Sequence, residues 1–161
     1  MDKKQKILIA LVITVMGLIF YFSNQIADTS EDLSKGIIYD IVNKFNLAQG
    51  KTQNQKEELI LQLNKIERKI AHYTIYTLLG IMLFLLIINI KKENKKAIII
   101  TIIIGAIYAT TDEIHQIFID GRTALITDVM LDTLGVTTGG FISMLIIGIY
   151  NKIKGNKEIK G

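Results

Sequence analysis

The sequence predicts an all-α fold, a four-helix polytopic membrane protein with amphipathic helices in the outer loop between the first two spans. Two observations carry this prediction. Half of the 161 residues are hydrophobic, and they form long blocks instead of recurring at the period of a soluble helix or strand. The lysines lie between these blocks and not within them. We therefore expect residues 1–161 to form a single membrane domain.

Four apolar blocks are candidates for membrane spans, for which about 20 residues are needed. We expect the spans at about 7–22, 70–90, 97–119 and 124–150. The first block is slightly short, and the fourth has 27 residues, more than a span requires. We expect the outer end of the fourth span to protrude, to tilt or to line a protein cavity.

Lysine placement predicts the topology, because positive charge marks the cytoplasmic side of a membrane. Lysines precede the first span, fill the connection between the second and third, and follow the fourth: Lys3, Lys4, Lys6, Lys91, Lys92, Lys95, Lys96, Lys152, Lys154, Lys157 and Lys160. We expect a multi-pass membrane protein with both termini in the cytoplasm. The net charge of +4 is then a topology signal and does not indicate binding to nucleic acid.

The extracytoplasmic segment 23–69 is expected to contain two amphipathic helices. Apolar residues recur there at helical spacing on both sides of a break at Gly50. Possible capping pairs begin at Thr29 and at Thr52. We expect the apolar faces to lie on the bilayer or to cover the outer ends of the spans as a folded lid.

Polar side chains gather at the expected outer ends of the spans, in one thin layer. A charge inside a bilayer costs roughly 2.5–3.5 kcal/mol on insertion scales, so such residues are candidates for function. The candidate ligand-binding residues are Gln25, His72, Asp112, Glu113, His115, Gln116, Arg122, Asp128 and Asp132. The candidate catalytic residues are Asp112, Glu113, His115 and Asp128.

Helical spacing predicts how these side chains group. Asp112 and His115 are three residues apart and are expected to share a helix face, with Gln116 beside them. Asp128 and Asp132 are four apart, so we expect them on one face of the fourth span. Both faces are expected to point into the bundle.

A track of small residues continues along the Asp128–Asp132 face: Gly135, Gly139 and Ser143. Small residues let membrane helices approach closely. We expect this track to pack against another helix, and it is also a candidate contact for an oligomer or for another envelope protein.

Purely structural explanations exist for the same residues, since buried ions must be paired whatever their purpose. Asp128 with Arg122, or Asp112 with His115, would then be neutralising pairs that set the helix register. His72 alone would be an interfacial histidine with its tip in water.

At these residues the sequence resembles the VanZ-like family of bacterial membrane proteins. The strongest match is the run Asp-Glu-Ile-His-Gln-Ile-Phe at 112–118, followed by Gly121-Arg122, Asp128 and Gly135. Weaker matches are Phe-Ser-Asn-Gln at 22–25 and the block 69–76, which contains His72 and Tyr76. The chain departs from the family pattern at Asp120, where a proline is usual, and at Asp132, where an asparagine is usual.

The resemblance implies a small protein of the bacterial cell envelope, and the name-giving member is associated with low-level resistance to the lipoglycopeptide teicoplanin. We expect a non-enzymatic protein that binds or shields an amphiphile, either a lipoglycopeptide or a lipid-linked wall precursor. Arg122 would grip a phosphate or carboxylate. Gln25, His72, His115 and Gln116 would bond sugar or peptide groups. No cofactor or resident metal is expected.

The alternative is an intramembrane enzyme that modifies a lipid head group or wall precursor. Under this alternative one carboxylate serves as a general base. A divalent metal held by His72, His115, Asp112, Glu113 and Asp128 would serve the same chemistry.

Overall fold

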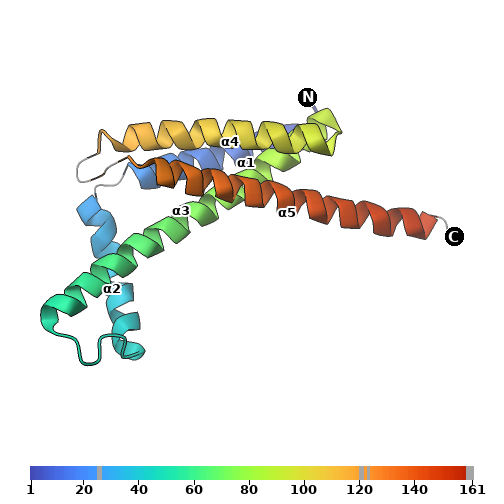
Figure 1. The fold of residues 1–161 in the computed structure, drawn as a ribbon. Helices are drawn as coiled ribbons and strands as arrows, with labels where there is room; N and C mark the ends of the chain where they lie inside the picture. Colours follow the sequence, from blue (N-terminus) through green and yellow to red (C-terminus); the bar gives the residue numbers. More distant parts are fainter. Residues whose placement is uncertain (25–26, 120–121, 123, 159–161) are drawn as a thin grey trace.

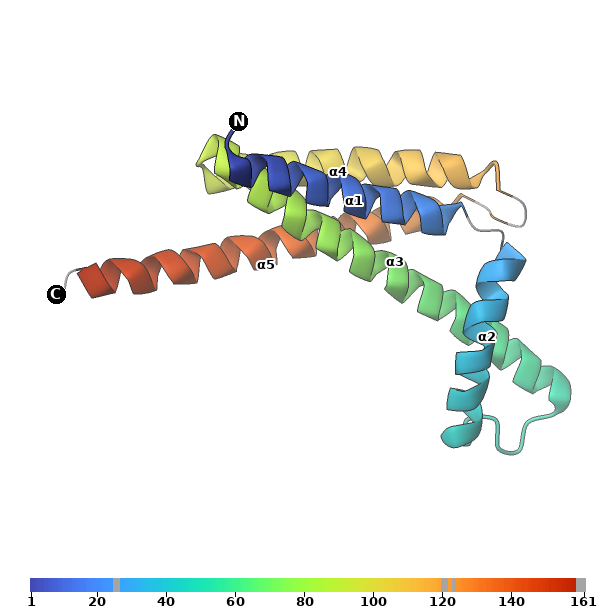
Figure 2. The same ribbon diagram turned by 180° about the vertical axis from the view of Figure 1, so that it is seen from behind.

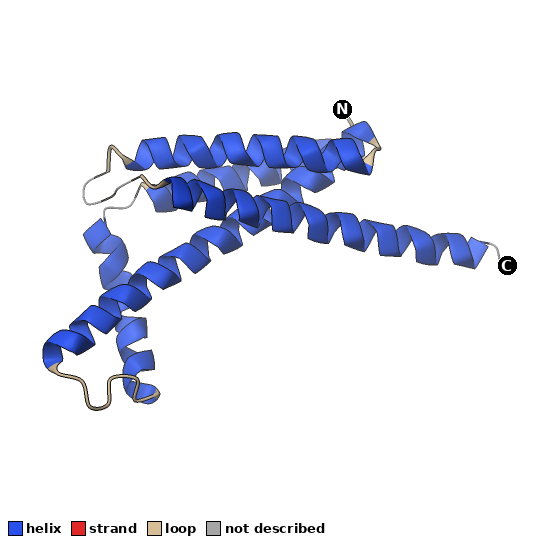
Figure 3. Ribbon diagram, viewed as in Figure 1, coloured by secondary structure: helices blue, strands red, loops and turns tan. Residues whose placement is uncertain are grey.

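The computed structural model describes residues 1–24, 27–119, 122 and 124–158, and its described elements are all helices (Figures 1 and 3). The all-α prediction is therefore confirmed. In chain order the helices are α1 (Lys3–Ser23), α2 (Ala27–Lys44), α3 (Gln53–Lys91), α4 (Asn94–Gln116) and α5 (Ile126–Glu158).

Four of these helices, α1, α3, α4 and α5, are long and apolar enough to cross a membrane. The molecule is thus a multi-pass membrane protein with the expected number of spans. Helix α3 has 39 residues and is therefore about 58 Å long, roughly twice the thickness of the hydrocarbon core. The expected span at 70–90 is its second half, and its first half carries the outer segment.

The outer segment is a helical hairpin formed by α2 and the first part of α3. A turn at Gly50, whose φ is +77°, separates the two helices, and Thr52 caps α3 as predicted. The predicted cap at Thr29 is wrong, because α2 begins at Ala27 and Thr29 lies inside its first turn. Ile38, Val42 and Ile60 form a small apolar cluster between the helices.

The helices alternate in direction, as the lysine pattern requires. The N-terminus, the α3–α4 connection and the C-terminal end of α5 lie toward one end of the molecule, and the C-terminal end of α4 and the N-terminal end of α5 lie toward the other (Figures 1 and 2). The outer hairpin projects from this second end. The three lysine clusters that predict the topology, which we call the lysine-rich segments, are therefore separated from the hairpin by the length of the bundle, although the hairpin has lysines of its own.

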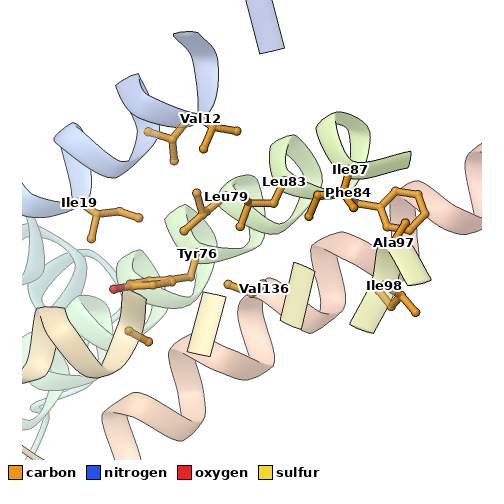
Figure 4. Packing of buried hydrophobic residues seen from close by; sticks show 12 residues of the cluster. Val12, Ile19, Tyr76, Leu79, Leu83, Phe84, Ile87, Ala97, Ile98 and Val136 are labelled. Carbon is orange, nitrogen blue, oxygen red and sulfur yellow. The ribbon is translucent and has the colours of Figure 1, made fainter. Parts of the chain in front are cut away.

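Helix α3 lies at the centre of the bundle and contacts each of the other four helices. Its buried side chains Tyr76, Leu79 and Phe84 pack with Ile19 of α1 and Val136 of α5 (Figure 4). Because α3 touches every other span, the position of its outer half fixes where the polar groups of the bundle meet.

The predicted small-residue track packs closely, and it does so against α3 of the same chain. A Cβ atom on Gly139 would lie 2.0 Å from the carbonyl oxygen of Thr77, and one on Gly135 would lie 2.7 Å from that of Tyr73. Ser143 is buried on the same face. An oligomer would therefore have to use a different surface, because α3 already fills this one.

Candidate functional site

Asp112, near the end of α4, is the most densely bonded polar residue of the outer layer. One of its carboxylate oxygens, Oδ2, accepts hydrogen bonds from Ser23 Oγ at 2.9 Å, Tyr76 Oη at 3.2 Å and Gln116 Nε2 at 3.3 Å. These donors come from α1, α3 and α4 itself. The other oxygen, Oδ1, is buried and has no hydrogen-bond partner.

Asp132 of α5 lies beside His72 of α3. The Nδ1 atom of His72 is 3.5 Å from Oδ2 of Asp132, which makes an ion-pair contact and not a well-formed hydrogen bond. Asp132 is fully buried, and neither of its carboxylate oxygens has a hydrogen-bond partner in the described part of the chain. One ligand atom each from His72, Asp112 and Asp132 lie within 4.8 Å of one another.

A small pocket of about 10 Å³, room for about one water molecule, opens beside this group, between α3, α4 and α5. Its lining residues are Arg68, Lys69, His72, Glu113, Gln116, Asp128, Leu131 and Asp132. Lys69 forms an ion pair with Asp128. The predicted pairing of Asp128 with Arg122 is therefore wrong, because the first half of α3 brings a closer base to Asp128.

Glu113 joins α4 to the start of α5. It is buried, and its Oε2 accepts a hydrogen bond from the backbone N–H of Leu125 at 2.9 Å. This bond holds the N-terminal end of α5 next to the pocket, which Glu113 also lines.

His115 turns away from the pocket, toward α1. Its ring stacks on Phe20 at 4.6 Å between centroids, and its Nε2 lies 3.3 Å from Oδ1 of Asn24. The expected pairing of Asp112 with His115 is wrong. Residues three apart on a helix differ by about 60° in direction, which is enough to aim the two side chains at different neighbours.

Arg122 is buried, and its hydrogen bonds lie on the same α1 side. Its Nη1 donates to Oε1 of Gln116 at 3.4 Å and its Nη2 donates to the carbonyl oxygen of Phe22 at 3.3 Å. Burial lowers the pKa of its guanidinium, and nearby Arg68 adds to this effect. Arg122 does not line the pocket. A phosphate or carboxylate in the pocket would therefore have to contact another basic residue.

The predicted residues thus separate into two groups. Those that line the pocket or adjoin it are His72, Asp112, Glu113, Gln116, Asp128 and Asp132. His115 and Arg122 lie on the α1 side. Gln25, Asp120 and Gly121 lie outside the described residues.

Sequence reasoning missed the basic residues of the pocket, Arg68 and Lys69, because they fall outside the expected span. A signal was present. Arg68, His72 and Tyr76 are spaced four residues apart and so form one row along α3. Continuing the helical period from the outer segment into the span places all three on the face that meets Asp112 and Asp132.

Four span-length helices and a polar pocket at one end of their bundle define a multi-pass membrane protein with a buried ionisable site. The family model VanZ/LLP1 matches residues 8–147, from α1 through most of α5, so the chain belongs to the VanZ/LLP1 family. This confirms the resemblance seen in the 112–118 run. No curated protein and no solved structure matches the chain.

Proposed function

We propose that the protein binds the polar head of an amphiphile at the outer leaflet of the bacterial cytoplasmic membrane and shields it. The observation that carries this proposal is the pocket between α3, α4 and α5. It joins two bases to several carboxylates at one end of a membrane-spanning bundle, where a head group and its acyl chain would separate. In ligand sites a few convergent polar groups of this kind fix the orientation of the bound molecule.

The lining residues suit a head group with both acidic and hydrogen-bond-donating parts. Arg68 offers planar, bidentate donors to a phosphate or carboxylate. Asp128 and Glu113 accept hydrogen bonds from hydroxyl or amino groups of a sugar or peptide. Teicoplanin-type lipoglycopeptides and lipid-linked wall precursors both combine such groups with an acyl chain, and low-level resistance would follow from shielding either one.

The orientation belongs to the same proposal. The pocket adjoins the outer hairpin, and the lysine-rich segments lie toward the opposite end (Figure 2). The positive-inside rule then directs the pocket outward and both termini into the cytoplasm.

The test compares two bases on the same helix. In lipid nanodiscs, Arg68→Ala should weaken binding of teicoplanin or of a lipid-linked wall precursor by about tenfold, the effect of about 1.4 kcal/mol from a lost charge-assisted bond. Lys65→Ala is the matched control, because Lys65 is exposed and does not line the pocket. Equal affinities for the two variants, or no binding to the wild type, would contradict the proposal.

A second function, an enzyme acting on a lipid head group, is favoured by one contact. His72 beside Asp132 is the arrangement of a general base with its orienting carboxylate. Lipid mass spectrometry of cells with and without the protein separates the two functions. A chemically altered envelope lipid that disappears in His72→Ala would favour the enzyme, and an unchanged lipid profile would favour the binding protein.

A further inference from the structure

We propose that His72, Asp112 and Asp132 bind a divalent transition-metal ion. Their three ligand atoms lie within 4.8 Å of one another, and His72 Nδ1 is 3.5 Å from Asp132 Oδ2. Two ligands at about 2.1 Å from a tetrahedral zinc ion are separated by about 3.4 Å. The His72–Asp132 distance already matches this value, so only Asp112 has to approach.

The carboxylates of this cluster lack the partners that burial demands. Both oxygens of Asp132 and one oxygen of Asp112 are buried without a hydrogen bond. Buried polar groups are nearly always bonded, and an ionised carboxylate pays the largest penalty when it is not. Among the described residues no Lys or Arg forms an ion pair with either side chain. A divalent ion would supply the missing partner to both.

The surroundings of Asp112 resemble those of a metal ligand. Its Oδ2 is held by donors from Ser23, Tyr76 and Gln116, which fixes the direction of the carboxylate and leaves Oδ1 free. Residues around metal sites commonly orient ligating carboxylates in this way.

The donor set selects the class of metal. One imidazole with two carboxylates suits Zn²⁺, Fe²⁺ or Mn²⁺, whereas Ca²⁺ and Mg²⁺ favour oxygen ligands throughout. Three protein ligands leave a coordination position open, and His72 and Asp132 also line the pocket. An anionic head group could therefore meet the ion there, among side chains that would otherwise repel it.

This proposal departs from the sequence-based expectation of a site without metal, and its ligands differ from the metal set considered under the enzyme hypothesis. His115 is excluded because it faces Asn24 and Phe20 on the α1 side. Asp132, which that set omitted, is the most deeply buried acid of the cluster. The inference does not depend on the proposed function, because metal binding is measurable without any amphiphile.

The experiment uses the full chain, purified in detergent, stripped with a chelator and dialysed against Zn²⁺ or Mn²⁺, with Mg²⁺ and Ca²⁺ in parallel. Elemental analysis should find one Zn²⁺ or Mn²⁺ per chain and no retained Mg²⁺ or Ca²⁺. His72→Ala and Asp132→Asn should each weaken binding at least tenfold. His115→Ala is the matched histidine control and should bind like the wild type.

Three outcomes would overturn the proposal. They are no stoichiometric metal in the wild type, equal loss in His115→Ala, or full retention in His72→Ala, which would leave His72 and Asp132 as a plain ion pair. Loss of folding is separated by the thermal midpoint of each variant in chelator, which should lie within about 4 °C of that of the stripped wild type. Teicoplanin binding by stripped protein reports on the proposed function separately from the metal.

Discussion

The two sides of the outer polar layer differ in how completely their buried groups are bonded. On the α1 side, Arg122 donates to Gln116 and to the carbonyl of Phe22, and His115 contacts Asn24. On the α3–α5 side, Asp132 has no hydrogen bond to either oxygen, although it is fully buried. Among the described residues the α1 side is thus largely partnered, with only Nε of Arg122 left without a hydrogen bond, whereas both oxygens of Asp132 lack one on the other side.

This difference separates structural from functional groups. A buried polar group that is bonded costs little and fixes how helices meet, while one that is unbonded costs stability and persists where a ligand or ion completes it. The α1 side therefore holds α1 to the end of α4. Under the proposed binding, the α3–α5 side, which contains the pocket, is the part that is less stable until its ligand or ion is bound.

The largest effect on stability is expected from Gly139→Ala, which would push α5 away from α3. The new Cβ would lie 2.0 Å from the carbonyl oxygen of Thr77, and helix backbones cannot yield as a side chain can. We expect a loss of about 3 kcal/mol in the free energy of unfolding. Thermal unfolding in detergent measures it.

Gly148→Ala provides the control, because a Cβ there meets no atom within 4 Å. It should leave stability unchanged or raise it by up to about 1 kcal/mol, as alanine favours a helix over glycine. Similar destabilisation by both substitutions would show that the α3–α5 crossing does not depend on the absence of a side chain at Gly139.

The second effect, from Arg122→Ala, tests the α1 side. Its loss leaves the buried Oε1 of Gln116 and the carbonyl of Phe22 without this donor, at an expected cost of about 2 kcal/mol. Arg68→Ala is the matched comparison and should change stability by less than about 0.5 kcal/mol. Chemical or thermal unfolding measures the loss in unfolding free energy for both variants. A larger loss for Arg68→Ala than for Arg122→Ala would contradict the structural role given to Arg122.

Much of the fold followed from the sequence because a bilayer imposes strong rules. Long apolar blocks and lysine placement were enough to predict four spans, and the four-residue spacing of Asp128 and Asp132 correctly placed them on one face. The same spacing carried on through Gly139, whose close packing on α3 is confirmed.

The partners of the polar groups could not be predicted in the same way. Helical period gives the direction of a side chain about its own axis, but not which neighbouring helix lies in that direction. His115 and Asp112 were therefore grouped together, although His115 stacks on Phe20 of α1 while Asp112 bonds to both Ser23 of α1 and Tyr76 of α3. Lys69 replaced Arg122 as the partner of Asp128 because α3 extends unbroken beyond the bilayer, and no local pattern reveals how far it leans toward α5.

The smallest effect is expected from His115→Ala, and it sharpens the contrast between the two histidines. It removes a stacking contact with Phe20 and one hydrogen bond to Asn24, for a loss of about 1 kcal/mol in unfolding free energy. His72→Ala in chelator should cost at least as much, since it removes a ring stack on Tyr76 and the ion-pair contact with buried Asp132. The measurement is the unfolding free energy of the wild type and of both variants, in chelator and in Zn²⁺. Zinc should stabilise the wild type and His115→Ala equally and should leave His72→Ala unchanged, because only His72 belongs to the side whose bonding is incomplete without a ligand.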